Sequence, residues 1–230
     1  MIPQAFVDFY GDQTRWFVGE VINVKDDPLK LGRAQVRVFG IYDEIDKDDL
    51  PWAQIVVPVT QGVHEGNGQY LGMLVGTQVF GIFLDGQNSQ LPMIVGSIPK
   101  EGDQNDRVEN VGEYPKNKVY KTETGHYREY DDTEGKTRIK EQHKSGTNYE
   151  VLEEGDRTTL VVKDERLVVV GDKYAVVVGN DELNVTGDIK IVVSGSATVE
   201  VTKEAKIKSA VSIDLSAPLI KLNGELKLNS

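Results

Sequence analysis

Glycine recurs every eight residues in the C-terminal part of the sequence, at positions 171, 179, 187 and 195. A valine stands two positions before each of these glycines, and an alanine or a branched aliphatic residue stands four positions after it. The register continues past the last glycine with Val201 and Ile207, and it begins earlier with Val161, two positions before Lys163. We call each eight-residue unit an octad, and each octad carries an apolar pair and a turn.

An octad is too short to form a core of its own, because eight extended residues span only about 26 Å, at about 3.3 Å per residue. Its apolar pair must therefore be buried against other copies of the chain, which predicts an oligomer of intertwined strands. A closed trimer is the natural solution, although the period alone does not set the number of copies. Each buried aliphatic side chain contributes up to about 1.5 to 3 kcal/mol. The predicted trimer core consists of Val169, Val177, Leu183, Val185, Ile191, Val193, Val199, Val201 and Ile207.

The N-terminal part contains five short apolar segments that read as strands. Residues 16–40 form two of them around a turn at 27–32, and the others lie at 52–59, 76–85 and 93–98. Glycine-rich or polar segments separate them, and no helical periodicity intervenes. Five strands of this kind fit a five-stranded Greek-key barrel of the OB type.

The composition changes after this barrel and divides the chain into three parts. Residues 1–100 are predicted to form the barrel domain, 101–124 a polar linker, and 125–230 a triple-stranded β-helix. The predicted fold class is all-β, with an N-terminal OB-fold barrel followed by an intertwined trimeric β-helix. Alternation persists near the C-terminus at Leu226 and Leu228, which are expected at the tip or in contact with a tip partner.

Charge and composition exclude several classes of function. The formal net charge is −11 and the pI about 4.8, which argues against nucleic acid as a partner because such binding needs lysine and arginine at the phosphates. Cysteine is absent, so disulfides, zinc–thiolate sites and thiol nucleophiles are excluded. No stretch approaches the roughly 20 apolar residues of a membrane span, and the N-terminus lacks a signal pattern, so the chain is expected to be soluble where it is made.

Four groups of residues could suggest a binding or catalytic site, and each has a simpler explanation. Aromatic residues of the barrel could stack on a ligand, but the acidic charge and their apolar neighbours favour packing in the core or on a partner. The acidic segment 43–49 lacks the spacing and the internal glycine of a calcium loop, so a solvated loop is expected. The aromatic residues are Phe39, Tyr42, Trp16 and Trp52, and the acidic ones are Asp43, Glu44, Asp46, Asp48 and Asp49.

The carboxylates Asp131, Asp132 and Glu134 could form a catalytic pair, but they are expected in a turn with Gly135. His64, His126 and His143 have no nucleophile or ligand set at a useful spacing and are interpreted as structural or surface residues. No nucleotide, serine-hydrolase or zinc-protease motif occurs. The sequence therefore predicts no enzyme and no cofactor.

Several segments together resemble the central spike proteins of contractile phage tails, which are relatives of the valine-glycine-repeat spike of type VI secretion. The barrel segments are DPLKLGRAQVRV (27–38), LPWAQIVVPV (50–59) and GTQVFGIFLDGQNSQLPMIVGSI (76–98). The segment GHYREYDDTEGKTRIKEQHKSGTNYE (125–150) is similar to the start of that family's β-helix, and the octads are similar to its shaft. Their order along the chain, combined with the octads, is the specific part of the resemblance.

The resemblance implies a homotrimer in the virion baseplate that attaches to tail-hub proteins through the barrel. The shaft would pierce the host outer envelope transiently, and a conical tip protein could cap its C-terminus. Two family features are missing: residues 101–124 are too few for the lysozyme domain of T-even-type spikes, and no His-x-His motif for a tip iron occurs.

Two other classes of function stay open at this point. A trimeric tail fibre or adhesin could use the same repeat, but it would need a receptor-binding head, and the sequence ends about 20 residues after its last clear octad. An OB-fold nucleic-acid binder would show salt-sensitive oligonucleotide affinity.

Overall fold

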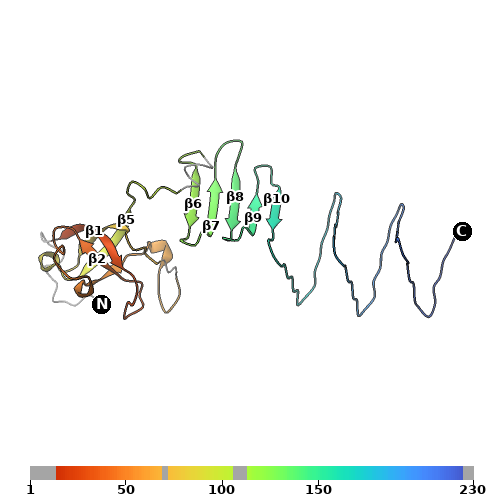
Figure 1. Cartoon of the computed structure of the whole chain (residues 1–230), viewed down its shortest axis with the longest axis horizontal. Helices are drawn as coiled ribbons and strands as arrows, with labels where there is room; N and C mark the ends of the chain where they lie inside the picture. The colour runs from red at the N-terminus through yellow and green to blue at the C-terminus, as the bar shows by residue number, and fades with distance from the viewer. Residues whose placement is uncertain (1–13, 69–71, 106–112, 225–230) are drawn as a thin grey trace. The chain divides into compact units, whose positions relative to one another are not determined.

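The barrel and the octads fold in different ways. The computed structural model describes residues 14–68, 72–105 and 113–224 (Figure 1). The chain divides between Leu167 and Val168 into two units, which are described separately below.

Five strands of the first unit close into a barrel in the order β1-β2-β3-β5-β4. All neighbouring strands are antiparallel except β3 and β5, which are parallel. Short 3-10 turns lie in the connections: η2 (Lys47–Asp49), η3 (Val59–Gln61) and η4 (Gly86–Asn88). The strands are β1 (Arg15–Asn23), β2 (Ala34–Val38), β3 (Trp52–Ile55), β4 (Gln78–Phe83) and β5 (Pro92–Ile98). The predicted five-stranded barrel is thus confirmed.

One predicted strand is shorter than expected. The apolar segment 52–59 pairs as a strand only over Trp52–Ile55, because Pro58 precedes a 3-10 turn that begins at Val59. Proline cannot donate a ladder hydrogen bond, which explains why the sheet ends before it.

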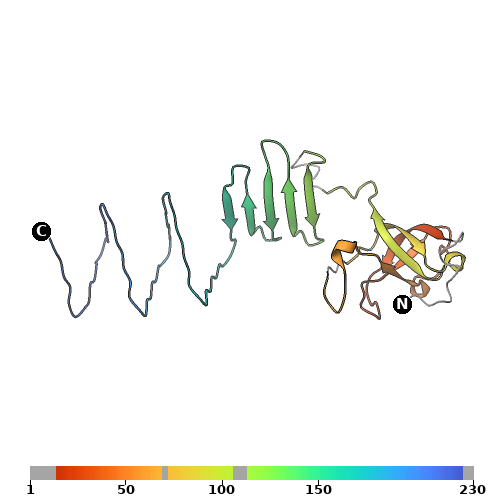
Figure 2. The ribbon, with the colours of Figure 1, turned by 180° about the vertical axis from the view of Figure 1, so that it is seen from behind.

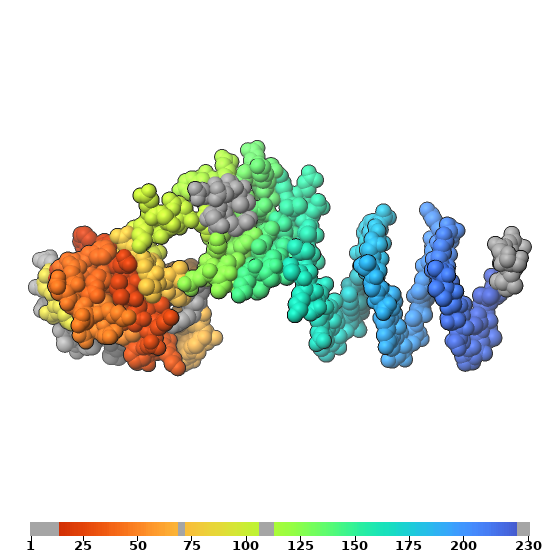
Figure 3. Space-filling model, viewed as in Figure 1, coloured from red at the N-terminus to blue at the C-terminus, as the bar shows by residue number. Residues whose placement is uncertain are grey.

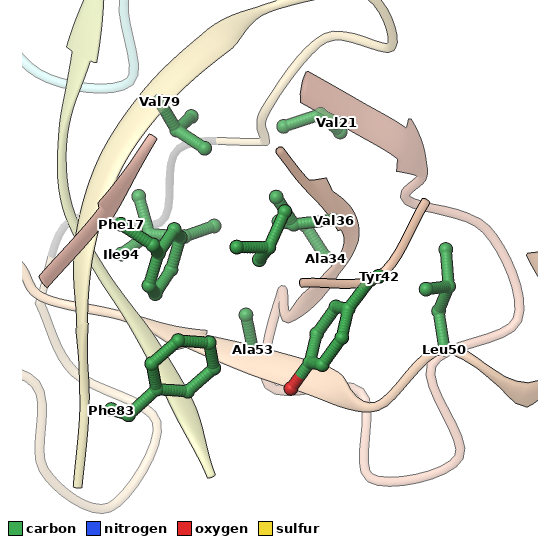
Figure 4. Packing of buried hydrophobic residues seen from close by; sticks show 11 residues of the cluster. Phe17, Val21, Ala34, Val36, Tyr42, Leu50, Ala53, Val79, Phe83 and Ile94 are labelled. Carbon is green, nitrogen blue, oxygen red and sulfur yellow. The ribbon is translucent and has the colours of Figure 1, made fainter. Parts of the chain in front are cut away.

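The barrel encloses its own hydrophobic core (Figure 4). The Phe17 and Phe83 rings lie 4.9 Å apart between centroids, and Tyr42 meets Phe83 edge-on at 5.9 Å. Close packing also explains Gly81, because a Cβ there would lie 2.3 Å from the ring of Phe17. The fully buried members are Phe17, Val21, Ala34, Val36, Val38, Tyr42, Leu50, Ala53, Val79, Phe83 and Ile94.

Two polar side chains are buried in the barrel with their hydrogen bonds made. Gln35 donates from Nε2 to Leu50 O at 2.7 Å and accepts from Asn23 Nδ2 at 2.7 Å. The Tyr42 hydroxyl donates to Ser89 O, and burial together with the nearby Asp85 charge raises the pKa of Tyr42 to about 12. Such satisfied groups avoid the cost of an unpaired buried polar atom.

The connection between β1 and β2 is organised by one carboxylate. Asp27 accepts hydrogen bonds from the backbone N–H groups of Leu29, Leu31 and Arg33 at 2.8 to 3.1 Å, and from the Arg33 guanidinium at 2.7 and 3.0 Å. The Arg33 hydrogen bonds and the backbone donors hold the pKa of Asp27 well below its usual range, although burial opposes this. Asp27 therefore fixes a turn whose leucines point to solvent.

A second sheet follows, in which five antiparallel strands pair in chain order (Figure 1) and are seen from the other side in Figure 2. Its first strand, β6 (Asn117–Lys121), lies within the segment predicted as linker and pairs with β7. The ordered sheet thus begins before residue 125, while the division into three domains stays a prediction. The other strands are β7 (Tyr127–Asp131), β8 (Arg138–Gln142), β9 (Asn148–Val151) and β10 (Arg157–Leu160).

The second unit has no paired strand among residues 168–224. Figure 3 shows this segment as a single thickness of chain that turns back and forth, with open space between successive legs. All its described residues are solvent-exposed. The triple-stranded β-helix is therefore a prediction that a single chain does not display.

Candidate functional site

Bends in the backbone recur every eight residues through the octads. They fall at 162–163, 170–171, 178–179, 186–187, 194–195, 202–203 and 210–211, and single bends follow at Pro218 and Gly224. Lys203 and Val211 thus occupy the place that glycine occupies in earlier octads. The period of the bends therefore extends beyond the period of the glycines.

Neither space nor backbone conformation within one chain explains the four octad glycines. A Cβ built at Gly171, Gly179, Gly187 or Gly195 would meet no atom within 4 Å, and none of the four lies in the left-handed region. Lys203 and Val211 show that the bend itself does not require glycine.

The residues predicted to form the trimer core are all exposed and have no intrachain core. Their exposed fractions run from 44% at Val169 to 90% at Val199. Large apolar side chains exposed in series are unusual on a soluble protein and mark an interaction surface. Exposed in the same way are Val177, Leu183, Val185, Ile191, Val193, Val201 and Ile207. The predicted tip residues Leu226 and Leu228 lie outside the described residues.

One face of the β6–β10 sheet carries a network of charged side chains, which we call the ionic face. Arg138 lies between three carboxylates, with Nη2 at 3.2 Å from Glu129 Oε1 and 3.7 Å from Asp131 Oδ2, and Nε at 3.5 Å from Glu150 Oε1. Glu150 also pairs with Lys140 at 3.5 Å. Sequence reasoning missed this network, because its members come from three strands that only the register brings together.

The opposite face, which we call the tyrosine face, is hollowed. Its central row runs across the strands from Tyr120 through Arg128, Glu141 and Tyr149 to Thr159, as the strand register requires. A hollow of about 880 Å³ is lined by this row and by the next one, which includes the two histidines. Its lining also includes Tyr127, Gln142 and Asn148, which the register places on the other side of the sheet. Arg128 pairs with Glu141 at 3.1 Å, and the Arg157 guanidinium lies 5.9 Å from the centre of the Tyr149 ring.

The candidate stacking aromatics do not converge on one site. Tyr42 belongs to the barrel core, and Trp52 is half-buried with the Arg33 guanidinium 5.8 Å from its ring centre. Trp16 is 65% exposed and lies 6.3 Å from the ring of Phe80 on the outside of the barrel, while Phe39 is also exposed. Core packing is confirmed for Tyr42 alone.

The candidate carboxylates occupy different environments. Asp43 accepts a hydrogen bond from Gly40 N at 3.0 Å, and all four of its acidic neighbours in the segment 43–49 are exposed. Asp131 was expected in a turn, but the structure places it as the buried last residue of β7. Burial raises the pKa of Asp131, but hydrogen bonds from Thr133 and the Arg138 charge outweigh this and lower it.

Two of the three histidines are brought together. The His126 and His143 rings lie 4.5 Å apart between centroids, at the edge of the tyrosine face. His143 Nδ1 is 2.8 Å from Ser145 Oγ, and His126 Nδ1 accepts a weak bond from Lys144 N at 3.4 Å. Throughout the part of the chain that the structure describes, no three histidine or carboxylate side chains form a metal-binding group. The same part contains no helix long and apolar enough to cross a membrane.

These features define an all-β protein in which a small closed barrel precedes a meander sheet and a periodic, unpaired repeat. The chain belongs to the Gp5 N-terminal OB domain family, whose model matches residues 34–166, more than half of the chain. The match covers β2 to β5 of the barrel and the whole β6–β10 sheet.

Two curated relatives carry the resemblance to spike proteins. The chain is 36% identical over 89 residues to the "Pre-baseplate central spike protein Gp5" of Enterobacteria phage T4, which covers 34% of this chain and 15% of that protein. It is 23% identical to "Protein Gp5" of Vibrio phage KVP40 over an alignment of 252 residues, which covers 69% of this chain and 60% of that protein. The chain thus spans less than two thirds of each relative. The predicted kinship with central spike proteins of phage tails is confirmed.

Proposed function

We propose that this protein is the central spike of a contractile phage tail or a related injection system, and that it acts as a homotrimer. The barrel, predicted at 1–100, attaches the spike to tail-hub proteins, and the octads form a triple-stranded β-helix. The observation that carries the proposal is the series of exposed apolar side chains, one pair per octad, that a single chain leaves without a core. The name of the phage T4 relative supports the baseplate location.

The mechanism is mechanical and involves no enzymatic step or cofactor. Sheath contraction drives the tube forward, and a stiff shaft transmits the force that pierces the host outer envelope. Burying the octad pairs of three chains makes the shaft stable, at about 1.5 to 3 kcal/mol for each side chain. The C-terminal end carries the tip or contacts a separate tip protein, and the virion holds the assembled spike after soluble synthesis in the host cytoplasm.

The mass of the purified full chain in light scattering tests the trimer. We expect three times the 25.5 kDa of one chain, independent of dilution into the micromolar range. A mass of 25.5 kDa at micromolar concentration would refute the proposal.

Deletions test whether the octad is the structural unit of the shaft. Removal of two whole octads, residues 179–194, should preserve the trimer, because the apolar core residues and the bends on either side of the deletion keep their eight-residue spacing. Removal of one and a half octads, residues 179–190, should disturb assembly, because the bends on either side of the deletion fall out of phase. Equal behaviour of the two deletions would contradict the β-helix.

A further inference from the structure

We propose that one end of the barrel, built from the β1–β2 and β3–β4 connections, is the surface that contacts a tail-hub protein, and that the Asp27 turn is its rigid anchor. We call it the apolar end, and we call the opposite end, built from the β2–β3 and β4–β5 connections, the acidic end. The inference rests on the proposed attachment through the barrel and names the part of the barrel surface that makes the contact.

The strand directions place these connections at opposite ends of the barrel. β1 is antiparallel to β2 and β4, β2 is antiparallel to β3, and β3 is parallel to β5. The C-terminal ends of β1, β3 and β5 therefore lie at the same end as the N-terminal ends of β2 and β4. Residues 24–33 and 56–77 connect strands at this end, whereas residues 39–51 and 84–91 connect them at the other.

The first argument is the distribution of exposed apolar side chains. Among the described residues of the connections at the apolar end, seven large apolar side chains are exposed, compared with two at the acidic end, Phe39 and Leu91. Apolar side chains gathered on one part of a small domain mark an interaction surface. The seven are Leu29, Leu31, Val56, Val59, Val63, Leu74 and Val75.

The second argument is the distribution of charge. The connections at the acidic end carry six carboxylates and one basic residue, Lys47, whereas those at the apolar end carry three charged residues of each sign. An apolar protein surface can cover the balanced end without desolvating an excess of carboxylates. The apolar end also lacks the basic excess that favours an anionic lipid surface. The inferred occupant is thus a protein surface that is apolar and carries little net charge.

The third argument is the rigidity of the Asp27 turn. The carboxylate of Asp27 accepts hydrogen bonds from three backbone N–H groups and from the Arg33 guanidinium. Lys30, between the two exposed leucines, has a left-handed φ of 51°, which is uncommon for a residue other than glycine. Such a conformation persists only where surrounding bonds impose it, and it gives reason to look for a function. Leucines fixed before binding lose little entropy when a partner covers them, which suits an anchor.

Cysteine labelling in isolated tail particles tests the inference. The chain contains no cysteine, so Leu29→Cys and Val59→Cys each place one thiol at the apolar end, and Glu44→Cys places one at the acidic end. All three positions are exposed in the single chain. Maleimide labelling of the spike peptides is measured by mass spectrometry in the free full-length spike and in tails that contain it. In tails we expect labelling of the first two variants to slow at least about tenfold, and that of Glu44→Cys to stay within about twofold.

Each outcome supports or overturns the inference. Unchanged labelling of Leu29→Cys in tails that contain the spike would overturn it, and protection of Glu44→Cys alone would move the contact to the acidic end. Protection of Leu29→Cys already in the free spike would show that another copy of the chain covers this end. Protection by vesicles of phosphatidylethanolamine and phosphatidylglycerol would show that a lipid surface does so. If the unaltered spike is absent from purified tails, the proposed function fails as well.

A second measurement tests the anchor directly. The double substitution Leu29→Ser and Leu31→Ser removes two exposed side chains, so the barrel should fold as before. Purified tails should retain at least about tenfold less of this variant than of the unaltered spike, because two apolar contacts are lost. Phe39→Ser is the control at the acidic end and should be retained normally. Equal retention of the two variants would contradict the role of the turn.

Discussion

The barrel and the octads use the same residue types in opposite ways. In the barrel, Val21, Val36 and Val79 are completely buried by strands of their own chain. In the octads, Val177, Val185 and Val193 recur with equal regularity but remain about half-exposed. A chain that closes a sheet into a barrel buries its valines against its own strands, whereas a single octad is too short to do so. The difference teaches that apolar periodicity predicts burial but does not say which chain provides it.

The largest effect is expected from a charge placed among the predicted trimer-core residues of the octads. Val193→Asp should abolish assembly, because copies of the carboxylate would be buried together without a counter-charge. Val192→Asp is the matched control, since Val192 is the adjacent valine, lies outside the predicted trimer core and is more exposed. Light scattering should find the first variant dissociated or aggregated and the second trimeric. A trimeric, heat-resistant Val193→Asp protein would show that the inward face is assigned wrongly.

The barrel should respond to loss of its own core without loss of the trimer. Phe83→Ala should lower the free energy of unfolding of the barrel by about 3 to 5 kcal/mol, because the ring contacts Phe17 and Tyr42. Both tryptophans lie on barrel strands, so tryptophan fluorescence during denaturant unfolding reports this domain.

Phe80→Ala is its control, because Phe80 lies on the same strand but points outward beside Trp16. Its effect should be clearly smaller. An equal loss of stability in the two variants would mean that the outer surface of the barrel is not free in the assembled protein.

The smallest effect concerns the Asp27 turn and depends on pH. The pKa of Asp27 is lowered in the folded protein, so its carboxylate stabilises the barrel above the ordinary aspartate pKa of about 4. This contribution is lost as the pH falls toward the lowered value. Asp27→Asn should therefore lower the unfolding temperature of the barrel near neutral pH, and the deficit should shrink in acid.

Asp26→Asn provides the comparison for this turn. Asp26 precedes Asp27, is solvent-exposed, and has a left-handed φ of 63° that asparagine tolerates. Its unfolding temperature should match that of the unaltered protein across the pH range. A pH-independent deficit in Asp27→Asn would show that shape, and not charge, holds the turn.

Much of the fold could be predicted because its signals are local. Ala34, Val36 and Val38 alternate with polar residues, which is the pattern of a strand with one buried side, and the structure buries all three completely. Gln35 breaks that alternation, since it is also buried, and only the positions of Asn23 and Leu50 explain why. These hydrogen-bond partners lie 12 and 15 residues away along the chain, so no local sequence pattern predicts that Gln35 is buried.

The candidate site was predictable only where it repeats. The octads revealed their apolar face through their period, whereas the tyrosine face draws its members from five strands whose register no local pattern encodes. β6 was overlooked for a related reason: Asn117–Lys121 is a polar edge strand, and it became recognisable only through its pairing with β7.

The bends that continue at Lys203 and Val211 make the octad a unit of length. Because the turn tolerates glycine, lysine and valine alike, a gene can gain or lose whole octads without rewriting the rest of the repeat. If the octads form the proposed shaft, each octad gained or lost changes its reach by one equal step and leaves its cross-section the same. Under the proposed piercing function, spikes that meet cell envelopes of different thickness would then differ in this count.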